Sequence, residues 1–373
     1  MEKVLEEKSR CCGCGACMDS CPFGAIWMKE DGEGFLYPQI DVEKCTDCGR
    51  CREVCPIGKA IGVDGKYGKQ GKQSDNGGQG RVFLGVRAKE DKIRFESSSG
   101  GVFPVLAEYV LSKGGVVFGA VMEKGGRVVH RDIHSASELA AMQKTKYVQS
   151  DLKGCFRKVK RYLEEGRRVL FSGTPCQCQA VKLYIGNEAE NLLLADLVCY
   201  GVPSPGIWKK YVRELEKKYG GVFAGFSFRD KRKKDNGHTM ALQIREKEYT
   251  WPMNQDAYCR LYFRNAILRP SCHFCDFCRP ERESDLTMGD FWGIEKVRPD
   301  MDDGMGTSLV ILHSEKARKV WEEIKEAFHY FQCGREDILQ PRLCRPTPVS
   351  GRRKYFMMLN RFLSVHLAEK ILR

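Results

Sequence analysis

The first fifty-five residues contain two copies of one cysteine spacing. The copies read Cys11-x2-Cys14-x2-Cys17-x3-Cys21-Pro22 and Cys45-x2-Cys48-x2-Cys51-x3-Cys55-Pro56. Iron in a [4Fe–4S] cube takes soft sulfur ligands in a tetrahedral arrangement, and two residues between cysteines let a tight turn surround three corners of the cube. The spacing therefore predicts two [4Fe–4S] clusters and one-electron transfer through this part of the chain.

This is the spacing of bacterial two-cluster ferredoxins, in which the fourth cysteine of each run binds the other run's cluster. By that rule the first cluster is held by Cys11, Cys14, Cys17 and Cys55, and the second by Cys45, Cys48, Cys51 and Cys21. The alternative is a pair of zinc sites, which rarely show this spacing with a following Cys-Pro. Cys12 falls outside the pattern, and we expect it to be a spare thiol.

A third group of cysteines lies far along the chain, at Cys272-x2-Cys275-x2-Cys278, without a nearby fourth. Cys176 and Cys199 each follow a predicted buried strand, and open α/β sheets bind ligands at the carboxyl ends of strands. Cys176 also opens a predicted helix, whose N-terminal dipole favours an anionic ligand. Both cysteines, brought beside Cys272 and Cys275, would complete a tetrahedral site. The spacing leaves two alternatives open: a zinc site that includes Cys278, and a nucleophilic thiol at Cys176.

Two segments are candidates for binding a flavin. Ser97-Ser-Ser-Gly-Gly-Val102 stands between a predicted strand and a predicted helix, where glycines let backbone N–H groups approach a phosphate. An ordinary turn with a serine N-cap is the alternative. The segment 143–150 mixes cations, hydroxyls and an aromatic ring, which also fits a solvated strand edge. There is no G-x-G-x-x-G or Walker sequence, so a Rossmann dinucleotide site is not supported.

The elements that must position these residues alternate between strand and helix from residue 81 onward. Strands are predicted at 82–88, 116–121, 168–172, 191–198, 222–228, 240–246 and 307–312. Helices are predicted at 101–113, 156–165, 176–185, 205–219, 256–267, 314–330 and 355–372. The fold class is therefore α/β, or α+β overall: a ferredoxin-like module followed by an α/β flavin-binding domain with a mostly parallel or mixed sheet.

Composition divides the chain into five segments. Residues 1–60 form the two-cluster module, with short strands at 26–28 and 35–40 around a glycine turn. Residues 61–80, with seven glycines, form a linker. The flavin-binding part spans 81–220, the part with Cys272 and Cys275 spans 221–350, and a C-terminal helix spans 351–373.

The overall composition indicates a cytoplasmic protein. The 373 residues include no apolar run long enough for a membrane span, and the charged N-terminus lacks a secretion signal. Nineteen cysteines, an odd number in metal-site spacings, indicate a reducing cytosol and fit an anaerobe. The net charge of +13 can offset anionic cofactors or attract an acidic electron-carrier protein. No nucleic-acid-binding motif accompanies it, which disfavours a zinc- and nucleic-acid-binding regulator.

Five motifs in order resemble the coenzyme F420 hydrogenase/dehydrogenase beta-subunit family, in its ferredoxin-fused branch. They are Ser98-Ser-Gly-Gly101, Lys146-Tyr-Val-Gln-Ser150, Ser172-Gly-Thr-Pro-Cys-Gln177, Asp196-Leu-Val-Cys-Tyr-Gly-Val-Pro-Ser204 and Ser284-Asp-Leu-Thr-Met-Gly-Asp-Phe-Trp-Gly293. Members are iron–sulfur flavoproteins that pass electrons between clusters, FAD and a substrate. The resemblance implies FAD beside Ser99, Gly100, Gly101, Lys146, Tyr147, Ser150 and Thr174. It also implies a third [4Fe–4S] cluster on Cys176, Cys199, Cys272 and Cys275, with Cys278 as a reserve ligand.

The resulting expectation is an oxidoreductase that passes electrons from a ferredoxin-type donor through [4Fe–4S] clusters to FAD and an unidentified acceptor. A non-catalytic electron-transfer subunit of a larger redox complex is the main alternative. The expected partners are a soluble ferredoxin or another redox protein, with a small-molecule substrate or a deazaflavin as candidate acceptors. We expect neither nucleic acid nor a membrane span. No catalytic acid or base can be assigned from the sequence.

Overall fold

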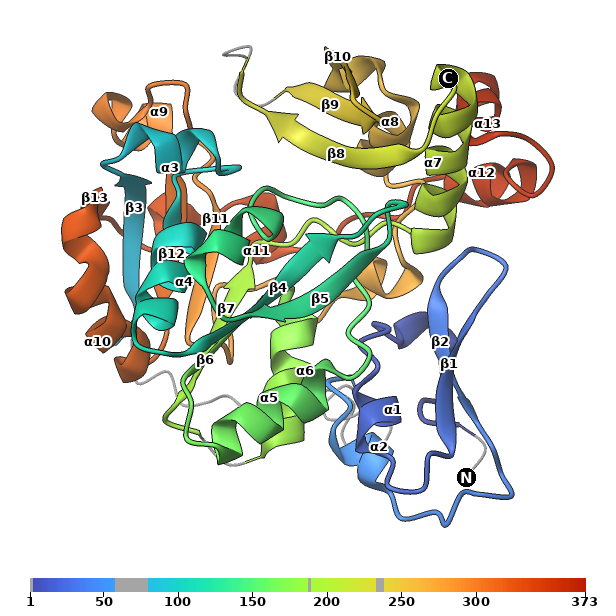
Figure 1. Ribbon diagram of the computed structural model, residues 1–373, viewed down its shortest axis with the longest axis horizontal. Coiled ribbons are helices and arrows are strands. Elements are labelled where there is room, and N and C mark those ends of the chain that lie inside the picture. Colours follow the sequence, from blue (N-terminus) through green and yellow to red (C-terminus); the bar gives the residue numbers. More distant parts are fainter. Residues whose placement is uncertain (1–2, 58–79, 187–188, 233–237) are drawn as a thin grey trace.

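The computed structural model describes residues 3–57, 80–186, 189–232 and 238–373 (Figure 1). Within them, the strands form a two-stranded, a three-stranded and an eight-stranded sheet. The glycine-rich linker expected at 61–80 falls outside the described residues except for Gly80.

The N-terminal module contains the short strands expected from its sequence. β1 (Ile26–Glu30) and β2 (Leu36–Ile40) pair in antiparallel fashion. Two short helices, α1 (Ala16–Ser20) and α2 (Arg50–Glu53), lie within the cysteine runs. Each follows a glycine in the left-handed region, Gly15 at φ 79° and Gly49 at φ 78°. Glycine adopts this conformation without steric cost, so each run can turn back between its cysteines.

The eight-stranded sheet is mixed, with strand order β13-β3-β12-β11-β7-β6-β4-β5. Its four central strands, β11, β7, β6 and β4, run parallel, and antiparallel pairs complete both sides. The strands are β3 (Val82–Ala88), β4 (Val116–Met122), β5 (Val128–Ile133), β6 (Val169–Gly173), β7 (Leu192–Leu197), β11 (Leu286–Asp290), β12 (Ser308–Leu312) and β13 (Phe328–Gln332). The mixed α/β fold class is confirmed, and strands from the expected parts 81–220 and 221–350 share this one sheet.

Helices cover both faces of the sheet. One face packs against α4 (Val102–Ser112) and α10 (Glu315–Ile324). The other packs against α5 (Cys155–Glu164) and α6 (Pro175–Ile185). Every residue of β6 is buried, as expected for a parallel strand with both faces covered. A short helix, α3 (Asp91–Phe95), precedes the 97–102 turn and was not expected from the sequence.

The second sheet forms a separate lobe with its own core (Figure 1). Its order is β10-β9-β8, from β8 (Phe223–Asp230), β9 (Thr239–Ile244) and β10 (Lys247–Pro252). α7 (Pro205–Tyr219), α8 (Ala257–Phe263), α12 (Arg353–Leu359) and α13 (Val365–Ile371) contribute to that core. Trp208 of α7 lies at its centre, almost fully buried and in contact with Phe228 and Tyr258.

Two predicted helices are wrong in extent. The helix expected at 314–330 ends at Ile324, because Phe328–Gln332 pairs with β3 as an edge strand. The single C-terminal helix expected within 351–373 is two helices. Lys210 donates to the carbonyl groups of Asn360 and Leu363 at the break, and Ser364 then caps the second helix by accepting from Leu367 N. Strands β5, β10, β11 and β13 were not predicted.

The N-terminal module shares a core with the eight-stranded sheet. α1 contacts α5 and α6, and the figure shows the module beside these helices (Figure 1). Cys12, Cys14, Ala16, Cys55 and Ile57 belong to the same buried cluster as the residues of β6, β7 and α6 on that face. The cysteine runs therefore lie directly against the α/β domain.

Candidate iron–sulfur and flavin site

The structure brings together the four thiols of the first predicted cluster: Cys11, Cys14, Cys17 and Cys55. Burial raises the pKa of Cys17, and the nearby thiols of Cys11 and Cys55 raise it further. For Cys14, a hydrogen bond with Cys12 lowers the pKa, but burial and the thiols of Cys17 and Cys55 prevail and raise it. Buried thiols this close resist ionisation unless a cationic partner such as iron is present. The crossed pairing of Cys55 with the first run fits this geometry.

The second predicted set consists of Cys45, Cys48, Cys51 and Cys21. Burial raises the pKa of Cys51, and the neighbouring Cys48 thiol contributes in the same direction. Cys21 packs against the buried cluster that contains Cys51, and its sulfur accepts a hydrogen bond from Ala25 N at 3.3 Å. For Cys45, the assignment rests on its place in the run. Cys48 is exposed, so this set lies nearest to the surface.

The third predicted set, Cys176, Cys199, Cys272 and Cys275, lines one small cavity, here called the thiol cavity. Cys176 lies in the first turn of α6, directly after β6, and Cys199 follows the neighbouring parallel strand β7. Cys272 lies in a 3-10 helix, Pro270–Phe274, which Cys275 ends. Burial raises the pKa of Cys199, and the thiols of Cys272, Cys176 and Cys275 raise it further. Both strand ends therefore lie where the sequence predicted.

Two more thiols line the same cavity. Cys278 lies within hydrogen-bonding reach of Cys275, which lowers the pKa of Cys278. Cys12, expected to be a spare thiol, interacts with both Cys14 of the first set and Cys176 of the third. Sequence reasoning missed this position because Cys12 has no partner at metal-site spacing along the chain.

A buried ion pair holds the segment that leads to Cys199. Asp196 is 0% exposed and accepts hydrogen bonds from Arg282 and from Thr287 Oγ1, both at 2.7 Å, and from Ser284 Oγ. Arg282 also donates to the Leu197 carbonyl at 2.9 Å. These contacts join the 196–204 and 284–293 motifs, so they fix the end of β7 from the side of β11.

Among the described residues, no three His, Cys, Asp or Glu side chains stand close enough to hold one metal ion. A mononuclear zinc site needs four ligands around a single centre, whereas each thiolate of a [4Fe–4S] cluster binds a different iron.

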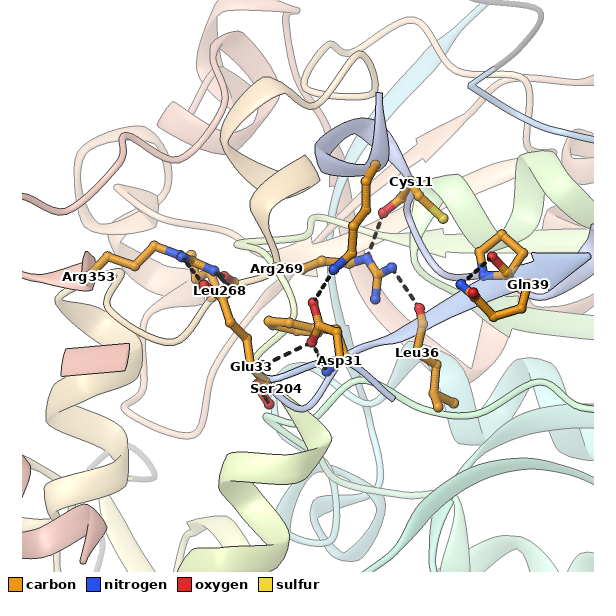
Figure 2. A network of polar contacts seen from close by, with 12 residues as sticks. Cys11, Asp31, Glu33, Leu36, Gln39, Ser204, Leu268, Arg269 and Arg353 are labelled. Carbon is orange, nitrogen blue, oxygen red and sulfur yellow. Dashed lines mark hydrogen bonds and ion pairs between the residues drawn. The ribbon is translucent and has the colours of Figure 1, made fainter. Parts of the chain in front are cut away.

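The buried cation Arg269 lies beside the thiols and bears on whether they fit an iron–sulfur cluster. Arg269 is 0% exposed and lies three residues before Cys272. Its guanidinium donates to the Cys11 carbonyl at 2.6 Å and the Leu36 carbonyl at 2.8 Å (Figure 2). It also donates to Gln149 Oε1 at 3.0 Å. A buried charge is costly unless an opposite charge lies nearby, and a thiolate-ligated [4Fe–4S] cluster is anionic, so the thiol sets fit such clusters.

A second, larger cavity adjoins the thiol cavity and opens to solvent; it is here called the open cavity. It encloses about 1850 Å³ of space, part of which is bulk solvent. Of the seven predicted flavin residues, six line it: Ser99, Gly101, Lys146, Tyr147, Ser150 and Thr174. Gly100 does not, because it packs against the sheet, where an added Cβ would lie 2.3 Å from the Val86 carbonyl.

The predicted flavin segments have defined local partners. Ser98 Oγ accepts a hydrogen bond from Thr145 N at 2.7 Å, so the 97–101 turn contacts the 143–150 segment directly. Lys146 Nζ donates to three carbonyl groups at the end of the 3-10 helix Ala136–Ala141, and burial lowers its pKa to about 7. Ser150 Oγ accepts from Gln177 of α6 at 3.1 Å.

Sequence reasoning missed several residues of the open cavity. Arg229 of β8 forms an ion pair with Asp290 at 2.6 Å, and both line the cavity. His130 is buried and its Nε2 donates to the Ser172 carbonyl at 3.0 Å, while among the described residues its Nδ1 has no hydrogen-bond partner. Trp292, 56% exposed, lines the cavity, as does Phe263. Of these, Asp290 and Trp292 belong to the quoted 284–293 motif, none of whose residues was assigned a role from the sequence.

Comparisons with known proteins identify two domains in the chain. Residues 166–332 match the family described as the C terminus of the beta subunit of coenzyme F420 hydrogenase/dehydrogenase, and residues 10–59 match the 4Fe-4S dicluster domain. A solved structure of the F420-reducing [NiFe] hydrogenase complex from Methanosarcina barkeri, in its xenon derivative, aligns over 78% of this chain and 90% of that chain. Their identity is 14% and the TM-score is 0.45. No curated protein matches the chain.

The fold and the matched domains define an iron–sulfur electron-transfer protein. Within that class, residues 166–332 match the C terminus of the beta subunit of coenzyme F420 hydrogenase/dehydrogenase, and a 4Fe-4S dicluster domain precedes them. The family expected from the sequence motifs is confirmed. The matched residues include Cys176, Cys199, Cys272 and Cys275, whereas the 97–101 and 143–150 segments lie outside them.

In the described part of the chain, no helix has the length and apolar character needed to cross a bilayer.

Proposed function

We propose that this chain is an iron–sulfur flavoprotein oxidoreductase. It takes single electrons from a ferredoxin-type donor and passes them through three [4Fe–4S] clusters to FAD and an unidentified acceptor. The observation that most directly supports the step from the third cluster to FAD is that the thiol cavity and the open cavity share part of their lining. The shared residues are Thr174, Cys199, Tyr200, Gly201 and Val202. A group in one cavity would therefore be separated from a group in the other by only a few residues.

The three thiol sets are the proposed cluster ligands. The N-terminal clusters use Cys11, Cys14, Cys17 and Cys55, and Cys45, Cys48, Cys51 and Cys21, in the crossed arrangement of two-cluster ferredoxins. The third uses Cys176, Cys199, Cys272 and Cys275. Its support is the convergence of two strand ends and one 3-10 helix on one cavity.

The open cavity is the proposed flavin site. A bound flavin would supply the step from one-electron carriers to two-electron chemistry. Gly101 caps the 11-residue helix α4 from the left-handed region, at φ 88°, and the exposed N–H groups and dipole of such a helix end attract phosphate. The rings of Tyr147 and Tyr262 stack 4.8 Å apart, and both line the cavity. Arg342 adds positive charge to its wall, whereas the charge of Arg229 is paired with Asp290.

The openness of this cavity favours an enzyme over a subunit that only relays electrons. A relay subunit would be expected to present its cofactor edge on a flat apolar surface. Here the exposed aromatic rings of Trp292 and Phe263 line an opening whose mainly apolar wall also carries charged groups. Such a combination of aromatic surface and a few polar groups is typical of sites for small ligands.

The test is metal and flavin analysis after anaerobic purification. We expect about twelve iron atoms per chain, from three clusters of four, and one FAD. The protein should show the absorption of both cofactors, and a reduced ferredoxin should bleach them. Zinc without flavin would refute the proposal. Iron at this level without FAD would favour the electron-transfer subunit instead.

A further inference from the structure

Arg269 lies at the junction between the N-terminal module and the α/β domain. Its side chain reaches the Cys11 and Leu36 carbonyls of the module (Figure 2). It also reaches Gln149 of the 143–150 segment. The guanidinium also stacks over the Tyr37 ring, 4.3 Å from its centroid. Gly13 leaves the space that the guanidinium fills, since a Cβ there would lie 2.5 Å from Arg269 Nη1.

Within the described part of the chain, every hydrogen-bond acceptor of this buried cation is neutral. The three acceptors are two backbone carbonyls and one amide oxygen, and within the described residues no carboxylate forms an ion pair with Arg269. Desolvation of an unpaired guanidinium costs several kcal/mol in general. The remaining source of negative charge is the neighbouring thiols. Cys11 provides one of the acceptor carbonyls, and Cys272 N donates to the Arg269 carbonyl at 3.0 Å, so both cysteines lie next to Arg269.

We propose that Arg269 is the positioning residue shared by the first N-terminal cluster and the third cluster. Its positive charge stabilises the reduced form of both clusters, and its forked hydrogen bonds hold their ligand segments together. Reduction adds a negative charge to a cluster, so a nearby cation raises its reduction potential. This inference rests on the proposed function, because it requires both thiol sets to hold clusters.

A purely structural role for Arg269 is the rival explanation, and Arg353 offers a matched control. Arg353 joins the same two parts of the protein, since it donates to both carboxylate oxygens of Glu33, one at 2.9 Å, and to the Leu268 carbonyl at 3.3 Å (Figure 2). It therefore restrains Leu268, the residue next to Arg269 in sequence. Unlike Arg269, it has its own carboxylate partner and does not line the thiol cavity.

The experiment compares Arg269→Gln, Arg269→Lys and Arg353→Gln with the wild type, all purified anaerobically. Iron content, melting temperature and the midpoint potentials of the clusters, from titrations followed by electron paramagnetic resonance, are measured for each. Arg269→Gln should retain its iron and shift the potentials of the first and third clusters downward. Arg269→Lys keeps the charge and should hold both potentials near wild type while lowering the melting temperature. Arg353→Gln should lower only the melting temperature.

Unchanged potentials in Arg269→Gln, or an equal downward shift in Arg353→Gln, would overturn the proposal. If Arg269→Gln fails to fold, Arg269→Lys decides: a fall of both potentials with iron retained would show that the charge is not the determinant. Wild-type protein without iron would refute the proposed function itself. The iron content of the wild type therefore distinguishes a failure of the proposed function from a failure of the proposal for Arg269.

Discussion

Gly206 at the start of α7 donates its N–H to the carbonyl of Gly34, in the turn between β1 and β2, at 3.1 Å. The two glycines meet backbone to backbone: a Cβ on Gly34 would lie 2.6 Å from both Gly206 Cα and Ser204 Oγ. Ser204 Oγ also donates to the Glu33 carbonyl at 2.6 Å. The N-terminal module is thus fixed on the α/β domain at a second point, away from its cysteines.

Replacing Gly34 with alanine should weaken this attachment. The residue has φ 81°, and the added methyl group has no space, so we expect a loss of about 1–3 kcal/mol in unfolding free energy. Gly32→Ala, in the same turn, is the control, because its Cβ would meet only Arg361 at 3.9 Å. Melting temperature and protease cleavage of the module are the measurements. Equal behaviour of the two variants would contradict the importance of this contact.

Replacing Cys176 with alanine should remove the third cluster, with a loss of about four irons per chain and retention of the N-terminal clusters. Cys178→Ala is the matched control, since Cys178 lies in the same helix and is fully buried but does not line the thiol cavity. Iron analysis and low-temperature magnetic resonance spectra measure the outcome. Full iron content in Cys176→Ala would show that the third cluster is placed wrongly.

Replacing Cys12 with alanine should keep all iron and lower the potential of the first or the third cluster. The Cys12 S–H lies between Cys14 and Cys176, and hydrogen bonds to cluster sulfurs raise the potential. Potentiometric titration checks this, with Cys155→Ala, a buried thiol outside the thiol cavity, as the control. A loss of about four irons would instead identify Cys12 as a cluster ligand.

Asp196→Ala should destabilise the fold by about 3–5 kcal/mol, because it leaves the Arg282 charge buried without its partner. The double variant Asp196→Ala with Arg282→Met should recover part of that loss, since no charge then remains unpaired. Anaerobic denaturant titrations of the three proteins measure both effects. A double variant less stable than Asp196→Ala would show that the charge pairing is not the source of the loss.

Acid should destabilise the protein through His130. Burial lowers its pKa from 6.5 to about 4, so the unfolded chain binds a proton that the folded protein does not. The contribution of neutral His130 to the unfolding free energy is therefore fully present above pH 6.5. It falls by about 3 kcal/mol as the pH drops to 4. His130→Gln keeps a donor for the Ser172 carbonyl without this titration. Its melting temperature should fall less between pH 7 and 5, and equal slopes would exclude His130 as a source.

The local sequence was enough for the features that depend on neighbouring residues. The spacing of the cysteine runs, the glycines that turn them and the alternation of strand and helix all act within a few residues. For the same reason the sequence placed Cys176 and Cys199 correctly at the ends of β6 and β7. It failed where elements end through distant contacts, as at β13, which forms only because the β3 edge is available to pair with it.

Only the tertiary structure decided what lies between the proposed cluster sites. Cys12 and Cys176, and Arg269 and Cys11, are separated by more than a hundred residues in sequence, and no periodicity relates them. Their contacts arise because the N-terminal module shares its hydrophobic core with α6 and its neighbouring strands. The sequence by itself determined that this protein contains iron–sulfur sites. How these sites are placed relative to one another depends on how the N-terminal module packs against the α/β domain. No single sequence motif specifies that packing.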